Sequence, residues 1–227
     1  MFDVFGTVVD WRGSIARDLS AWGVARGIAI DWALFADDWR AGYQPAMAPV
    51  RDGKVPFRII DTLHRELLDR LLVKYGLTQL SEAEKDHVNR IWHRLDPWPD
   101  AVSGLWRLKQ RFTIGTLSNG NVALLVNMAK HAGLPWDVVL SAELARNYKP
   151  DSSVYRLAPN LLGVEPGAVI MVAAHEGDLV AAAKSGLRTA YIARPLEFGP
   201  GRKPHDDPAG VDLVVRDFTQ LADRLGA

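Results

Sequence analysis

The sequence predicts an α/β protein in which a doubly wound, mostly parallel sheet carries an inserted helical cap domain. Three observations support this class. After Pro97, short apolar runs alternate with helical segments, and parallel strands require such crossover helices. Residues 11–95 show only helical spacing of apolar residues. Polar motifs stand repeatedly where an apolar run ends, which in open α/β sheets is where ligand and catalytic groups collect.

The first expected strand spans residues 2–5 and carries Asp3, which is followed by a turn at Gly6 and the hydroxyl of Thr7. A central parallel strand usually has about 5 to 6 residues. We therefore expect this strand to be shortened at its amino end, because the sequence was trimmed or because its start codon was mis-assigned.

The cap domain is expected at residues 11–95, and the core domain at residues 1–10 and 96–227. Apolar residues in the cap recur at spacings of three and four, which is typical of amphipathic helices. The expected cap helices span residues 15–24, 32–47, 57–75 and 81–95. A cap over the strand ends would close a chamber and exclude water, which strengthens electrostatic interactions inside it.

The rest of the core is expected to alternate strands and helices. The strands are expected at residues 112–117, 138–141, 169–174, 189–193 and 213–215, and the helices at 101–109, 121–132, 152–162, 178–185 and 218–225. Pro159 should kink or shorten its helix, and Gly133, Gly163 and Gly186 are expected helix stops. Residues 194–210 are interpreted as a long surface loop.

Composition narrows the function classes. The 227 residues include 27 basic and 27 acidic side chains and no cysteine. Zero formal charge provides no field that attracts nucleic acid or an acidic membrane surface, and the missing cysteine excludes disulfides, thiolate metal sites and a cysteine nucleophile. No apolar run approaches the roughly 20 residues that span a bilayer. We expect a cytoplasmic protein with no nucleic-acid or membrane partner.

Asp3 is the candidate nucleophile, because a carboxylate with an ordinary pKa of ~3.9 is ionised at neutral pH. An aspartate of a simple turn or helix N-cap is the alternative. The order of the later motifs favours catalysis: Thr116–Gly120, Tyr148–Asp151 and Val172–Asp178 all follow apolar runs.

The other candidates also have plainer alternatives. Lys149 could hold Asp3 ionised or be a solvated loop lysine. Asp178 could act in the site or cap a helix. Ser118 and Asn119 offer donors suited to an anion, or form an Asn-Gly turn. His175 is the only one of six histidines in a strand-end motif.

Together these residues resemble the haloacid dehalogenase superfamily, whose sheet is Rossmann-like, and within it the type II L-2-haloacid dehalogenases. The resemblance covers nearly the full chain. It is carried by Phe2–Thr7, by Trp39, Arg40 and Tyr43, by Leu117–Gly120, by Tyr148–Asp151 with Tyr155, and by Asp178. Taken alone, Arg40 would be interpreted as a surface helix arginine, so its functional role depends on the resemblance.

The resemblance implies hydrolysis of short (S)-2-haloacids or haloacetates to (R)-2-hydroxy acids or glycolate. Asp3 would attack the halogen-bearing carbon and form an ester, and Arg40 with Asn119 would receive the halide. Ser118 and the backbone near Val4 and Phe5 would bind the substrate carboxylate. The residues that would support the nucleophile, the substrate and the hydrolytic water are Thr7, Lys149, Tyr155 and Asp178.

Position 5 separates branches of the superfamily. Its phosphatases place a second aspartate two residues after the nucleophile, to protonate the leaving alcohol, and this chain has Phe5. A halide leaves without a proton. The resemblance therefore implies a dehalogenase that needs no metal and no cofactor.

The chain departs from the family before Asp178, where Ala173, His175 and Gly177 replace the usual serine, asparagine and bulky aromatic residue. We hypothesise that His175 is the base or orienter of the hydrolytic water, because imidazole titrates near neutrality. The alternative is that it only fills space.

Two other functions stay open: another hydrolase on this scaffold, acting on a small strained ring or a phosphate ester, and a non-catalytic small-anion binding protein. The eight tryptophans and apolar cap faces favour a homodimer.

Overall fold

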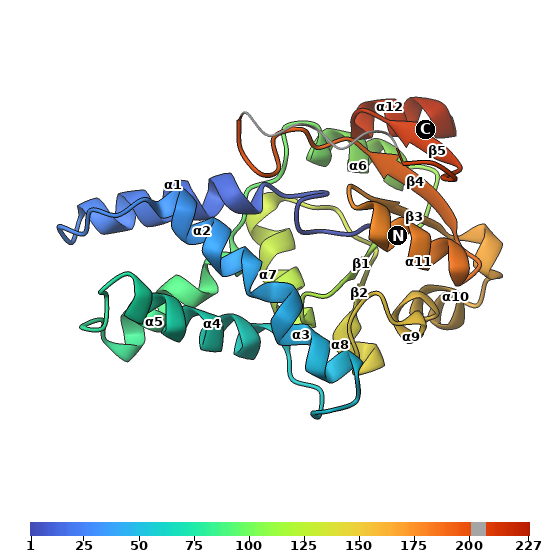
Figure 1. Ribbon diagram of the computed structural model, residues 1–227. Coiled ribbons are helices and arrows are strands. Elements are labelled where there is room, and N and C mark those ends of the chain that lie inside the picture. Colours follow the sequence, from blue (N-terminus) through green and yellow to red (C-terminus); the bar gives the residue numbers. More distant parts are fainter. Residues whose placement is uncertain (201–207) are drawn as a thin grey trace.

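A computed structural model describes residues 1–200 and 208–227 of the chain. Figure 1 shows a group of helices on one side and a sheet with its own helices on the other. The described helices include none that is long and apolar enough to cross a bilayer.

The sheet confirms the predicted parallel α/β class. Strand β1 (Gly115–Ser118) pairs in parallel with β2 (Val138–Ser141). Strands β3 (Ile170–Ala173), β4 (Arg188–Ile192) and β5 (Leu213–Val215) form a second parallel set. β1 begins later than predicted, because the Phe112 N–H donates to the Leu108 carbonyl and extends the preceding helical turn.

The first residues of the chain join these two sets of strands. Phe2 forms parallel bridges to Thr116 and to Val172, and the Asp3 N–H donates to the Val172 carbonyl at 3.0 Å. The order across the sheet is therefore β2, β1, residues 1–3, β3, β4, β5. The predicted strand at residues 2–5 is too long, because the Val4 carbonyl instead accepts from Val8. Asp3 is thus the last residue paired to the central part of the sheet.

Helices cross between the strands much as predicted. They are α6 (Ala101–Lys109), α7 (Val122–Ala132), α8 (Ala142–Ala145), α9 (Ser152–Tyr155), α10 (Leu157–Leu162), the 3-10 helix η2 (Pro166–Ala168), α11 (Glu176–Lys184) and α12 (Phe218–Leu225). The predicted helix at 152–162 divides at Arg156. Pro159 lies in the first turn of α10, where a missing N–H costs no helical bond. Gly133 and Gly163 end α7 and α10 with positive φ, which confirms both stops.

Every regular element between Trp11 and His93 is a helix. They are α1 (Trp11–Val24), α2 (Trp32–Ala41), α3 (Tyr43–Arg51), α4 (Ile60–Lys74), α5 (Glu82–Asn89) and the 3-10 helix η1 (Arg90–His93). The predicted helix at 32–47 is divided at Gly42. A Cβ atom there would lie 2.4 Å from Leu67, so glycine permits close packing of the α2–α3 corner on α4.

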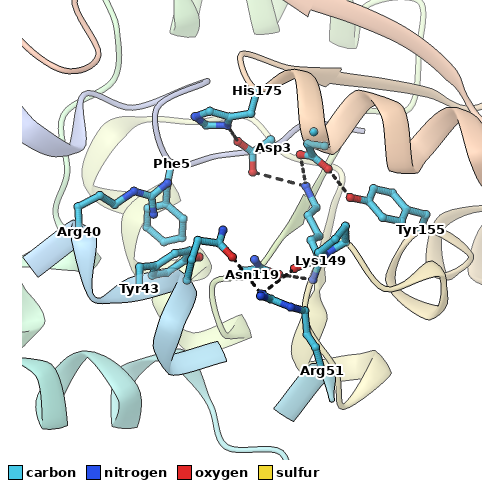
Figure 2. A pocket seen from close by; sticks show the side chains of 13 residues that line it. Asp3, Phe5, Arg40, Tyr43, Arg51, Asn119, Lys149, Tyr155 and His175 are labelled. Atoms are coloured by element: carbon cyan, nitrogen blue, oxygen red, sulfur yellow. Dashed lines mark hydrogen bonds and ion pairs between the residues drawn. The ribbon is translucent and has the colours of Figure 1, made fainter. Parts of the chain in front are cut away.

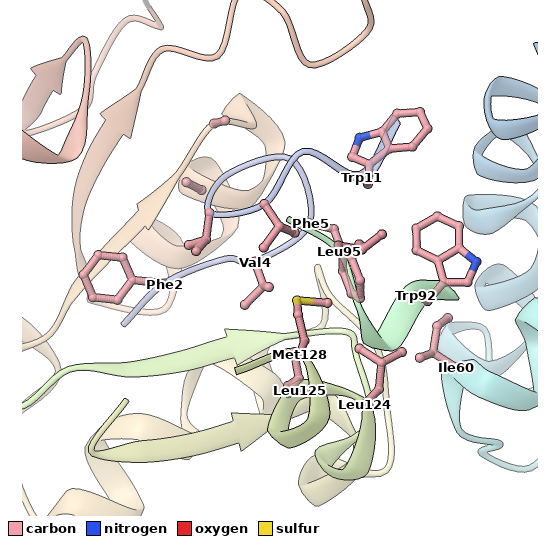
Figure 3. Packing of buried hydrophobic residues seen from close by; sticks show 14 of the residues in the cluster. Phe2, Val4, Phe5, Trp11, Ile60, Trp92, Leu95, Leu124, Leu125 and Met128 are labelled. Carbon is pink, nitrogen blue, oxygen red and sulfur yellow. The ribbon is translucent and has the colours of Figure 1, made fainter. Parts of the chain in front are cut away.

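A continuous apolar core connects these helices to the sheet. Phe5 packs edge-on against Trp92 at 5.8 Å between ring centroids, and Trp92 lies near Trp11 at 6.5 Å. Figure 3 shows these rings beside Leu124 and Met128 of α7. The chain on the carboxyl side of Asp3 is therefore held on several sides, which fixes the position of its carboxylate.

Candidate active site

A pocket of about 450 Å³ lies at the carboxyl ends of the central strands, against α2 and α3. Its lining residues are Asp3, Phe5, Arg40, Tyr43, Gln44, Arg51, Asn119, Lys149, Pro150, Tyr155, His175, Gly177 and Asp178. Figure 2 shows their side chains converging from the sheet edge and the cap helices. The structure thus brings most of the predicted site residues to one place.

Asp3 is buried at 8% exposure and surrounded by donors. The Thr7 hydroxyl donates to Asp3 Oδ2 at 2.8 Å, and His175 Nδ1 lies 3.2 Å from the same oxygen. Lys149 Nζ lies 3.5 Å from Oδ1. Burial raises the pKa of Asp3, but the charge of Lys149 and the bond to His175 outweigh it and hold this pKa well below its usual range. Asp3 is therefore a buried carboxylate that stays ionised.

Lys149 also binds the second aspartate. Its ammonium donates to Asp178 Oδ2 at 2.7 Å, and the Tyr155 hydroxyl donates to Asp178 Oδ1 at 2.6 Å. Burial raises the pKa of Asp178 against the opposing effect of Lys149. The solvated-loop alternative for Lys149 is wrong, because only 7% of it is exposed. The capping alternative for Asp178 is also wrong, since His175 occupies the N-cap position of α11.

His175 bridges Asp3 to a residue that sequence reasoning missed. Its Nε2 lies 2.9 Å from Glu197 Oε1, which also accepts from Trp11 Nε1–H at 3.1 Å. Burial lowers the pKa of His175, but the bonds to Asp3 and Glu197 raise it to about 10. Asp3 and Glu197 therefore hold a protonated imidazole between them.

Glu197 corrects the interpretation of residues 194–210 as a surface loop, because it is 3% exposed. Residues 201–207 of that stretch lie outside the described residues. The available signal was positional: Glu197 follows β4, whose end lies at the same sheet edge as the other motifs.

Arg40 belongs to α2, and its guanidinium lines the pocket. It lies 4.3 Å over the Tyr43 ring and 5.5 Å from the Trp11 ring. Its Nη1 is buried and has no hydrogen-bond partner among the described residues. Asn119 Oδ1 accepts the Lys149 N–H at 2.8 Å, which leaves its amide NH₂ to donate. Arg40 Nη1 thus provides an unused donor for an anion, and the Asn119 amide lies beside Tyr43 in the same pocket.

Three predicted residues do not line the pocket. Thr7 supports Asp3 without lining the pocket. Its hydroxyl donates to Asp3 and accepts the Ala174 N–H at 3.0 Å. Ser118 is fully buried and accepts from the Gly120 N–H at 3.3 Å. The Val4 side chain packs in the core (Figure 3). For Val4 only the backbone remains as a possible ligand, as the resemblance implied.

Within residues 1–200 and 208–227, no set of three histidine, cysteine or acidic side chains is arranged to hold a metal ion.

An ionised aspartate lies at a strand end under helices and is paired with a lysine that also binds a second aspartate. This arrangement in a parallel α/β fold places the chain in the class of α/β hydrolytic enzymes. A family model for haloacid dehalogenase-like hydrolases matches residues 1–186. The chain belongs to the haloacid dehalogenase-like hydrolase family.

Individual relatives indicate the kind of enzyme within this family. The crystal structure of a defluorinating L-2-haloacid dehalogenase is 46% identical in sequence, with a TM-score of 0.95, and the match covers 100% of this chain and 94% of that chain. A second L-2-haloacid dehalogenase structure is 44% identical, with a TM-score of 0.95, over 99% and 97% of the two chains. The (S)-2-haloacid dehalogenase 1 of Pseudomonas sp. (strain CBS-3) is 28% identical over 90% of this chain and 89% of its own length.

Proposed function

We propose that the protein hydrolyses the carbon–halogen bond of short (S)-2-haloacids or haloacetates, giving (R)-2-hydroxy acids or glycolate and halide. The observation that carries this proposal is a buried, ionised Asp3 beside Phe5, with Asn119 and the unpartnered Nη1 of Arg40 in the same pocket. The names of the most similar relatives support the same reaction.

In the first step, an oxygen of Asp3 attacks C2 of the substrate as the carbon–halogen bond breaks and the halide leaves with the electron pair. Attack from the side opposite the halogen inverts C2. Arg40 and Asn119 receive the halide. The backbone N–H groups near Val4 and Phe5 bind the substrate carboxylate, and Ser118 supports the turn that carries Asn119 by accepting the Gly120 N–H.

In the second step, water attacks the Asp3 carbonyl carbon, and His175 takes its proton. Esterification removes the Asp3 charge that helps raise the pKa of His175, so the imidazole releases its proton to solvent and becomes a base. Glu197 holds the ring through Nε2 and leaves Nδ1 toward Asp3. Breakdown of the ester restores the Asp3 carboxylate and the imidazolium, so the net products are the hydroxy acid, the halide and one proton.

This assignment predicts that His175→Ala slows ester hydrolysis more than ester formation. We expect intact-protein mass spectrometry to show the mass of the esterified enzyme during turnover, with steady-state halide release reduced about 10²- to 10⁴-fold. Glu197→Gln keeps the imidazole and serves as the matched variant, with a smaller loss. Unchanged turnover with no accumulated ester in His175→Ala would show that His175 is not the base.

Phe5 supports a reaction without metal or cofactor. Its ring packs against Tyr43 and Trp92 at 6.4 and 5.8 Å between centroids, so the position that holds an acid in the phosphatases offers no proton donor or metal ligand. A leaving halide requires neither.

We propose residues 11–95 as the cap domain and residues 1–10 and 96–227 as the core domain, in a cytoplasmic homodimer. Most tryptophans that favoured a dimer are buried, although Trp106 is 49% exposed. Light scattering on the purified protein tests the dimer.

A halide-release panel tests the reaction. The substrates are fluoro-, chloro- and bromoacetate and both enantiomers of 2-chloropropionate, with a chelator present throughout. We expect halide release from the (S) enantiomer and from at least one haloacetate. Activity that appears only with magnesium and a phosphate ester, or no turnover with retained anion binding, would contradict the proposal.

A further inference from the structure

Two polar residues of the pocket, Gln44 and Arg51, have no role in the proposed reaction. Arg51, at the end of α3, lines the pocket with Gln44. Arg51 Nη1 donates to Gln44 Oε1 at 3.0 Å and lies 3.4 Å from the Lys149 carbonyl oxygen. Both acceptors are uncharged, so they position the guanidinium without forming an ion pair with it.

Two of the cationic side chains that line the pocket, Arg40 and Arg51, lack an acidic partner among the described residues. Lys149 is paired with Asp3 and Asp178, and the imidazolium of His175 lies between Asp3 and Glu197. Neither Arg40 nor Arg51 has a carboxylate partner within ion-pair distance in the described part of the chain. In the proposed reaction Arg40 receives the halide, so Arg51 is left without a ligand when the substrate is a 2-haloacid with one carboxylate.

Arg51 lies too far from Asp3 to bind the carboxylate next to the reacting carbon. It contacts the backbone of Lys149, whereas Asp3 contacts the far end of the same side chain at 3.5 Å. Nearly the length of a lysine side chain therefore separates the guanidinium from the nucleophile. Figure 2 shows Arg51 on the side of Lys149 away from Asp3 and His175.

The space between Asp3 and Arg51 can hold a substrate longer than a haloacetate. The pocket of about 450 Å³ is at the scale of pockets that enclose ligands much larger than a haloacetate. Gln44 is exposed and Arg51 is half-buried, so the distal end of a bound molecule would meet this arginine at the rim. An anionic group one or two carbons beyond the reacting carbon would fall there.

We propose that Arg51 binds a second carboxylate, and that the substrates of this site include (S)-2-halodicarboxylic acids such as 2-chlorosuccinate. This inference rests on the proposed function. Asp3 forms its bond to C2 while the carbon–chlorine bond breaks, chloride leaves with the electron pair, and water releases the 2-hydroxydicarboxylate as above. The planar guanidinium suits a carboxylate because it can donate two parallel N–H bonds.

The test compares 2-chlorosuccinate with (S)-2-chlorobutanoate, which has the same chain length and a methyl group in place of the distal carboxylate. We expect Arg51→Gln to lower the ratio of kcat/KM for the dicarboxylate to that for the monocarboxylate by roughly 10- to 100-fold, the effect of losing a charge-assisted hydrogen bond. Arg51→Lys should lose less. The matched control is Arg58→Gln, because Arg58 pairs with Glu66 away from the pocket, and it should leave the ratio unchanged.

A binding measurement separates this inference from the proposed reaction. Calorimetry with succinate and butyrate needs no turnover, and we expect wild type to bind succinate more tightly, with the preference lost in Arg51→Gln. If neither chloro acid releases chloride but this preference is present, the reaction is wrong and the carboxylate site stands. If 2-chlorobutanoate reacts while succinate shows no Arg51-dependent preference, the second carboxylate site is overturned and the reaction stands.

Discussion

We expect Asp3→Asn to abolish halide release from a 2-haloacid, with a loss on the order of 10⁴-fold or more, the scale seen when a catalytic nucleophile is removed. The amide keeps the size of the side chain and can still accept from Thr7. It lacks the negative charge that displaces halide, so no ester forms. The measurement is halide release by wild-type and variant enzyme on (S)-2-chloropropionate.

The variant must be fresh and checked for deamidation by mass spectrometry, because conversion of Asn back to Asp restores the enzyme. Asp151→Asn is the matched control. That carboxylate caps α9 through the Ser153 N–H at 2.8 Å and lies outside the pocket. Its activity should stay near that of wild type. A fully active, deamidation-free Asp3→Asn enzyme would falsify the covalent mechanism.

Lys149→Met should cost about 10²- to 10³-fold in kcat/KM, the scale of removing one preorganised electrostatic partner. The lysine ammonium is the cation shared by Asp3 and Asp178, and its charge is the largest influence holding the pKa of Asp3 below its usual range against burial. Without it, two buried carboxylates face each other, so the pKa of Asp3 rises and a larger fraction of the nucleophile is protonated.

The role of the Lys149 charge also predicts the direction in which the pH dependence of kcat/KM changes. In wild type, kcat/KM should stay level as pH falls toward 5, because Asp3 remains ionised there. In Lys149→Met the acid limb should move to higher pH, and part of the lost activity should return as pH rises. Lys149→Arg keeps a cation and should keep the limb near its wild-type position. Equal acid limbs in all three enzymes would contradict the role of this charge.

The part of the site predicted from sequence is the part built from strand ends. Asp3, Asn119 and His175 lie at or just after strand ends, and parallel strands bring their carboxyl ends to one edge. Lys149 follows β2 after the short helix α8. Their convergence in one pocket follows from that topology. Strand and helix positions were predicted for the same reason, since alternation of apolar runs with helical spacing is a local pattern.

What the sequence could not predict depends on contacts between distant segments. Glu197 is an acidic residue in a Pro- and Gly-rich stretch, and only the folded chain shows Trp11 and His175 beside it. Arg51 resembles any helix-terminal arginine until α3 is packed against the Lys149 segment. The break at Gly42 likewise depends on Leu67, which is distant in sequence.

Oxygen tracing tests the central claim, the transient bond between Asp3 and the substrate, most directly. The enzyme is mixed in ¹⁸O-water with less (S)-2-chloropropionate than active sites, so that each site turns over at most once. The account predicts lactate with unlabelled oxygen donated by Asp3, and one ¹⁸O in the peptide that contains Asp3. Labelled lactate together with an unlabelled peptide would mean that water attacks the substrate directly, and would contradict the account.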